Sequence, residues 1–188
     1  GDALALHDVA ASPSEPQALI APWLAPSDAA IRVLLGPQDD YFAHEAIEAF
    51  LNARWRLGAR SDRMAYRLEG PPIAHRRGHD IVSDGVAMGA IQIPGDGMPL
   101  ALMADRQPTG GYPKIATVIG ADLGRLAQLR PGESLRFASV TWEEAVAARR
   151  AYRAAIEAGA ERAPLMRDLT SESLLAENLV GGVVSAKD

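Results

Sequence analysis

Residues 104–118, ADRQPTGGYPKIATV, bring two cations, a carboxylate, a hydroxyl and a pair of glycines into one short stretch. The backbone N–H groups of Gly110 and Gly111 can donate to an anion, Arg106 and Lys114 carry positive charge, and Thr109 adds a hydroxyl. Clusters of ionisable residues in loops are also often structural. The stretch therefore predicts either an anion-binding loop or a wide hairpin with solvated polar side chains.

The spacing within this stretch excludes a Walker-type phosphate loop. That motif needs a lysine directly after its second glycine, at the start of a helix. Here Tyr112 and Pro113 intervene, and the residues that follow are β-like. No GxSxG elbow supports a serine hydrolase, and a chain without cysteine has no thiolate nucleophile.

A second dense cluster, RSDRMAYRLEG, occupies residues 60–70. Alternation along a strand would place Arg63 and Arg67 on one face and Asp62 on the face of Met64. This pattern indicates either a cationic barrel rim or a solvated edge with surface ion pairs. Gln92, a polar residue inside an apolar strand, points either into a site or outward.

Two weaker signals favour structural roles. Asp40 is expected to cap a following helix rather than to join Asp39 in a metal or acid–base pair. His75 and His79 have the i,i+4 spacing of a metal site, but the surrounding glycine and prolines oppose a helix there. No metal site is predicted.

Short β-like runs separated by turn residues predict a mainly β fold with peripheral helices. About eight strands with few helices favour a closed β-barrel, with Gly95-Asp96-Gly97 as a hairpin turn. A Thr141-x-x-Glu144 capping box opens the clearest helix, over 142–158. The expected strands are 31–35, one near 55–57, 64–68, 81–83, 88–93, 99–104, 112–119 and 134–140, with further helices after Asp40 and over 121–129.

Three regions follow from this pattern. Residues 1–30 form an extended segment or linker that is interpreted as the continuation of a preceding half, 31–140 form the barrel, and 141–188 form C-terminal helices and a tail. In the tail, a short helix over 171–178 and a strand over 180–184 are expected.

Composition limits the classes of partner. The 19 basic and 24 acidic residues give a net charge of −5, and no basic block accompanies aromatic residues, so nucleic acid is not an expected partner. No apolar run reaches the roughly 20 residues that span a bilayer. No membrane association and a cytoplasmic location are therefore expected.

Four segments together resemble the allophanate hydrolase subunit 2 family of biotin-dependent carboxyltransferases. Its members include the C subunit of 5-oxoprolinase, the antagonist (KipA) of a sporulation kinase inhibitor, and a domain of urea carboxylase. The resemblance implies a cyclophilin-like barrel and the C-terminal half of a longer subunit. The segments are IRVLLGPQDDYF, SDRMAYRLEGPPIAH, IVSDGVAMGAIQIPGDGMP and LMADRQPTGGYPKIATVIGADLGRLAQLRPGESLRF.

The resemblance to the oxoprolinase subunit implies ATP-dependent opening of the 5-oxoproline lactam to glutamate. ATP with Mg²⁺ would act in a complex with a homologous, KipI-like barrel subunit and a lactam-hydrolase subunit. Lys114 and Arg106 would offset phosphate or oxyanion charge, and Asp105 would orient or deprotonate. The substrate or anion would contact a wider set of residues: Arg63, Arg67, Gln92, Thr109, Gly110, Gly111 and Tyr112.

Two other functions stay open. A carboxyltransferase would move a carboxyl group from carboxybiotin, carried on another chain, to urea or a similar amide. A regulatory or scaffold subunit would bind a kinase-inhibitor-like partner without chemistry of its own. The family pattern is broken at Ala65, which replaces a common glycine, and at Pro108, which replaces a common threonine.

Overall fold

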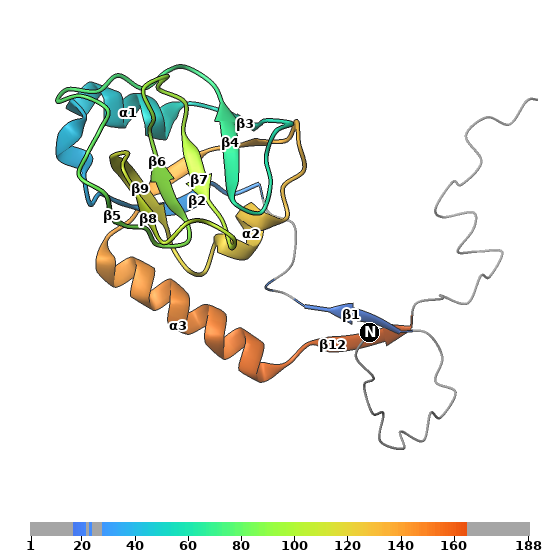
Figure 1. The fold of residues 1–188 in the computed structure, drawn as a ribbon. Helices are drawn as coiled ribbons and strands as arrows, with labels where there is room; N and C mark the ends of the chain where they lie inside the picture. The colour runs from blue at the N-terminus through green and yellow to red at the C-terminus, as the bar shows by residue number, and fades with distance from the viewer. Residues whose placement is uncertain (1–16, 22, 24–27, 165–188) are drawn as a thin grey trace, which may run out of the picture. The chain divides into compact units, whose positions relative to one another are not determined.

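The computed structural model describes residues 17–21, 23 and 28–164. Most of its regular elements are short strands, which confirms the expected mainly β fold with a few helices (Figure 1). The strands are β1 (Gln17–Ile20), β2 (Ile31–Leu35), β3 (Trp55–Leu57), β4 (Ala65–Glu69), β5 (Asp84–Gly85), β6 (Ala90–Gln92), β7 (Leu100–Leu102), β8 (Thr109–Gly110), β9 (Lys114–Val118), β10 (Ser134–Leu135), β11 (Phe137–Ser139) and β12 (Glu161–Pro164).

Eight of these strands form one sheet in the order β10-β3-β4-β7-β6-β9-β2-β11. The two edge strands, β10 and β11, are consecutive in the chain and separated only by Arg136. β10 pairs with β3 at one edge, whereas β11 pairs in parallel with β2 at the other. A single segment therefore joins both edges of the sheet, and the expected barrel is confirmed.

Alternation along the strands fills the barrel with apolar side chains. In β2, Ile31 and Val33 are buried, and in β3 the same holds for Trp55 and Leu57 on either side of an exposed arginine. The strands β6 and β9 are buried along most of their length, because both lie in the middle of the sheet. This core belongs to the unit of residues 23–158.

Three helices accompany the barrel: α1 (His44–Asn52), α2 (Leu123–Ala127) and α3 (Trp142–Ala158). The helix α1 inserts Phe50 into the core, where its ring stacks on Phe137 with centroids 4.8 Å apart. The helix α3 lies along the outside of the barrel (Figure 1) and contacts it through Ala145. Its predicted capping box is confirmed, because Glu144 N donates to Thr141 Oγ1 and Thr141 N donates to the Glu144 carboxylate.

Two small ladders lie outside the main sheet. β5 pairs with β8 through Asp84 with Gly110 and Gly85 with Thr109. β1 pairs antiparallel with β12, in a separate unit of the chain. The strand β1 falls within residues 1–30, where only an extended segment was expected.

Three local predictions are wrong. Asp40 does not cap α1, because it lies in the 3-10 turn η2 (Asp39–Tyr41), ahead of the N-cap residue Ala43, and pairs with Arg77 instead. The strand expected at 81–83 is not formed there; the nearest strand is β5, which begins at Asp84. Asp62 is outside β4 and accepts hydrogen bonds from the backbone of Met64 and Ala65.

Other expectations fall outside the described residues. These are the segment 1–16, the helix expected at 171–178 and the strand expected at 180–184. Within the described part, no helix is long and apolar enough to cross a membrane.

Candidate anion-binding site

Lys114 is the most unusual of the predicted site residues, because its charged side chain is only 3% exposed. It is the first residue of β9, and the sequence contains one other lysine, Lys187. A buried ammonium is costly unless it is paired. Its ammonium donates to Asp84 Oδ2 at 2.9 Å.

Gln38 binds both members of this pair. Its side-chain amide nitrogen donates to Asp84 Oδ2 at 3.3 Å, and its amide oxygen accepts from the Lys114 backbone N–H at 3.2 Å. The backbone N–H of Gln38 in turn donates to the Lys114 carbonyl at 3.1 Å. Gln38 thus fixes the lysine backbone and the carboxylate together.

The carboxylate of Asp84 is held by three donors. Besides Lys114 and Gln38, the backbone N–H of Gly85 donates to Asp84 Oδ1 at 2.8 Å. The hydrogen bond from Lys114 is the largest cause that lowers the pKa of Asp84 below its ordinary value, followed by the Gly85 N–H and the lysine charge. Asp84 is therefore ionised at neutral pH and neutralises the buried cation.

Gln92 lies in the buried part of the same region. Its side chain is inward, and its amide nitrogen donates to the Tyr112 carbonyl at 3.3 Å. Gly110 packs directly on this amide: a Cβ at Gly110 would lie 2.5 Å from Gln92 Nε2. Gly110 also pairs with Asp84 across β5 and β8, so the loop after β7 is tied to both Asp84 and Gln92.

Several other predicted residues are placed by structural contacts. Arg106 is half-buried, and its Nε donates to the Val86 carbonyl at 3.0 Å, so part of its guanidinium is committed to the backbone. Thr109 is exposed in β8, and Gly111 accepts a hydrogen bond from Ile81 N. Tyr112 is 39% exposed.

The remaining predicted residues gather around β4. Arg63 and Asp105 form an exposed ion pair, with Nε to Oδ2 at 3.1 Å, in which the side chains are 82% and 52% exposed. Arg67 is exposed on β4. Asp105 is thus paired with Arg63, whereas Lys114 is paired with Asp84.

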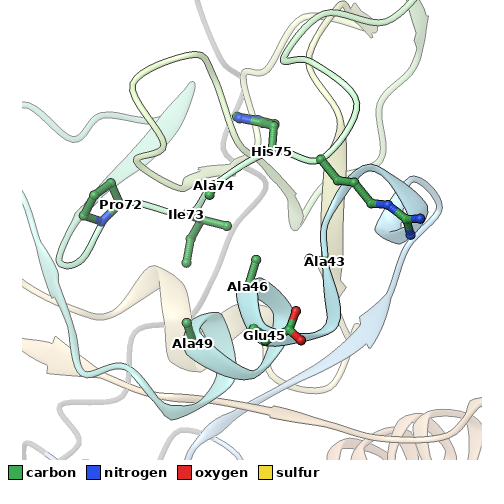
Figure 2. Close-up of a pocket in the computed structure, with 9 residues that line it drawn as sticks. Ala43, Glu45, Ala46, Ala49, Pro72, Ile73, Ala74 and His75 are labelled. Carbon is green, nitrogen blue, oxygen red and sulfur yellow. The ribbon is translucent and has the colours of Figure 1, made fainter.

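A pocket of about 300 Å³ lies elsewhere, between α1 and residues 72–76 (Figure 2). Alanines of α1 face Ile73 and Pro72 across it, with Glu45, His75 and Arg76 among its polar lining residues. None of the predicted site residues lines this pocket. Among the described residues, no three His, Asp or Glu side chains are grouped closely enough to hold a metal ion.

Sequence reasoning missed Gln38 and Asp84 as partners of Lys114. Asp84 lies between the strands expected at 81–83 and 88–93, and Gln38 directly precedes the two aspartates that were considered as a pair. Both residues lie next to expected strands, within two of the four segments that resemble the family, and this position could have indicated them. Only the pairing of β2 with β9 and of β5 with β8 brings them to Lys114.

Comparison with known proteins identifies the family. A family model described as the carboxyltransferase domain, subdomain A and B, matches residues 1–139. The chain belongs to this family. The resemblance seen in the motifs is thereby confirmed.

Individual relatives have two kinds of name. The chain is 40% identical over 119 residues to the C subunit of 5-oxoprolinase from Escherichia coli, a match that covers 63% of this chain and 38% of the relative. It is 31% identical over 142 residues to urea amidolyase of Saccharomyces cerevisiae, covering 68% of this chain and 8% of the relative. The chain therefore spans well under half the length of these relatives.

A solved structure shares the fold. The crystal structure of urea amidolyase from Kluyveromyces lactis superposes with a TM-score of 0.67 at 26% identity, covering 81% of this chain and 10% of that one.

Proposed function

We propose that this chain is part of a 5-oxoprolinase, in which it helps an ATP-dependent complex to open the 5-oxoproline lactam to glutamate. The carboxyltransferase-domain family supports the proposal in outline. The identity of 40% to a 5-oxoprolinase subunit, against 31% to a urea amidolyase, favours this reaction within the family. A homologous barrel subunit and a lactam-hydrolase subunit would complete the complex.

The observation that carries the proposal is the buried ammonium of Lys114. A lactam is a poor electrophile, so its opening is helped when its oxygen is phosphorylated, or when the negative charge that develops on this oxygen during attack by water is stabilised. A fixed cation in a site shielded from water stabilises such charge strongly. The Lys114 ammonium has three N–H donors, of which Asp84 accepts one, and the proposed reaction requires another to reach the substrate oxygen.

The site suits an oxyanion rather than a metal. Its donors are the Lys114 ammonium and the Gln38 side-chain amide, and both donate to Oδ2 of the Asp84 carboxylate. ATP with Mg²⁺ supplies the phosphoryl group when the complex is loaded. The residues of this chain would bind and orient the anionic group of the substrate.

A second function is favoured by the structural likeness to urea amidolyase. In that case carboxybiotin on another chain would donate its carboxyl group to an amide nitrogen such as that of urea. The same Lys114 ammonium would stabilise the charge that develops on the ureido oxygen of biotin.

Replacing Lys114 tests the proposal in the assembled complex. The full-length subunit with Lys114→Met is combined with its partner subunits, and ATP-dependent glutamate release from 5-oxoproline is measured. Methionine keeps most of the buried volume but removes the charge. We expect kcat/KM to fall about 100-fold or more, while size-exclusion chromatography shows unchanged assembly.

Arg56→Met is the matched control, because Arg56 forms an exposed ion pair with Glu69 on another part of the barrel. It should leave turnover within about twofold of wild type. Unchanged turnover in Lys114→Met would contradict a chemical role and favour a purely scaffolding role. Biotin-dependent urea carboxylation by the wild-type assembly, without glutamate release, would favour the second function.

A further inference from the structure

We propose that Asp84 is a positioning residue, which holds the Lys114 ammonium in place for an anionic oxygen of the substrate, with Gln38 as the link between them. This inference rests on the proposed function of Lys114. It adds two residues, Asp84 and Gln38, to which the sequence motifs assign no chemical role.

The three residues form a closed set of contacts. Lys114 Nζ donates to Asp84 Oδ2 at 2.9 Å, and Gln38 Nε2 donates to the same oxygen at 3.3 Å. Gln38 also exchanges hydrogen bonds with the backbone of Lys114 in both directions. Movement of any one residue therefore disturbs the other two, which fixes the direction of the lysine side chain.

Burial differs between the partners in a way that suits this role. The Lys114 side chain is 3% exposed, whereas the Asp84 side chain is 53% exposed. The carboxylate can therefore stay hydrated on one side while it balances the buried cation on the other. Because the ammonium keeps two further N–H donors, Asp84 does not exhaust its capacity to bind a ligand.

Asp84 reaches this position through a short ladder. The strand β5 contains only Asp84 and Gly85, and it pairs with Thr109 and Gly110 of β8. Val86 N and Ile81 N extend the pairing by donating to the carbonyls of Pro108 and Gly111. The glycine-rich loop thereby sets the place of the carboxylate.

The first test measures the lysine directly and needs no turnover. The full-length protein is reductively methylated with formaldehyde and borohydride, and the rate at Lys114 is followed by mass spectrometry, with Lys187 as the internal reference. In Asp84→Asn we expect Lys114 to react about tenfold faster, because the side chain loses the charge-assisted hydrogen bond that holds it in its buried position and becomes more accessible to the reagent. Asp84→Glu should retain a rate within about threefold of wild type.

The second test measures kcat and KM of the assembled complex with 5-oxoproline. Asp84→Asn should lower kcat/KM about 10- to 100-fold through misplacement of the cation, and Asp84→Glu should restore much of it. Glu69→Gln is the matched control, since Glu69 is 52% exposed and paired with Arg56. Glu69→Gln should change neither the kinetic constants of the complex nor the methylation rate of Lys114.

The outcomes separate this inference from the proposed function. An unchanged methylation rate in Asp84→Asn would overturn it, as would faster methylation with wild-type kcat and KM. A lower KM in Asp84→Asn would also overturn it, because Asp84 would then compete with the substrate. If the wild-type complex releases no glutamate, the proposed function fails, and the methylation rates still decide whether Asp84 holds Lys114.

Discussion

At the scale of single residues, the site depends on Gly110, because a residue with a Cβ would collide with Gln92 there. The inward amide of Gln92 occupies the space beside it, and the adjoining backbone carries the pairing with Asp84. Neighbouring Gly111 is in a different position, because a Cβ there would meet only the Ile81 carbonyl, at 3.5 Å. The two glycines of the motif therefore have different structural requirements.

Gly110→Ala should destabilise the protein by about 1–3 kcal/mol, because the new methyl group must displace the buried Gln92 amide. Gly111→Ala is the control and should change the free energy of unfolding by less than about 0.5 kcal/mol. Urea denaturation followed by tryptophan fluorescence measures both. Equal effects at the two positions would contradict this interpretation of the close contact.

At the scale of elements, Asp122 joins α2 to β2. Its buried carboxylate accepts from the backbone N–H of Arg32 at 2.8 Å, and from Arg32 Nε and Nη2 at 3.0 and 2.7 Å. Burial raises the pKa of Asp122, but the Arg32 hydrogen bonds and charge together outweigh it and lower the pKa below its ordinary value. The ionised carboxylate is therefore part of the folded state.

Asp122→Asn should cost about 2 kcal/mol at pH 7, a value reduced from that of a fully buried pair because Arg32 is 39% exposed. Since the folded-state pKa is lower than the unfolded one, the ionised group stabilises the fold above about pH 4. This contribution is lost as the pH falls through the lowered pKa. Denaturation of both proteins from pH 7 to pH 3 should show their difference narrowing below pH 4; a constant difference would contradict it.

At the scale of the whole molecule, the barrel is closed by one segment that pairs first with β3 and then with β2. Phe137 of β11 anchors this segment, because its ring is buried against Phe50 of α1. The side chain of Phe137 therefore joins the helix α1, the closing strand β11 and the interior of the barrel. Loss of this contact should affect the whole cooperative unit.

Phe137→Ala should destabilise the protein by about 3–5 kcal/mol through loss of buried area and the cavity left behind. Trp142→Ala is a control of similar size, since Trp142 is 67% exposed. Thermal unfolding followed by circular dichroism compares the two. A loss below about 1 kcal/mol for Phe137→Ala would show that closure does not depend on this contact.

The sequence by itself determined the features that depend on near neighbours in the chain. Strand alternation, turn glycines and the Thr141–Glu144 capping box are local, so the mainly β character of the fold and the course of α3 followed from them. The motif around Gly110 and Lys114 also indicated the family and drew attention to the one lysine of the barrel. Asp40 was misjudged because its partner, Arg77, is distant in the sequence.

Only the tertiary structure decided which of the charged residues act together. Lys114, Asp84 and Gln38 are far apart in the sequence and meet because β9 pairs with β2 while β5 pairs with β8. The same fold pairs Asp105 with Arg63 in an ion pair at the surface, whereas the side chain of Lys114 is buried. Burial and long-range pairing are properties of strand register across the whole barrel, and no local pattern in the sequence records them.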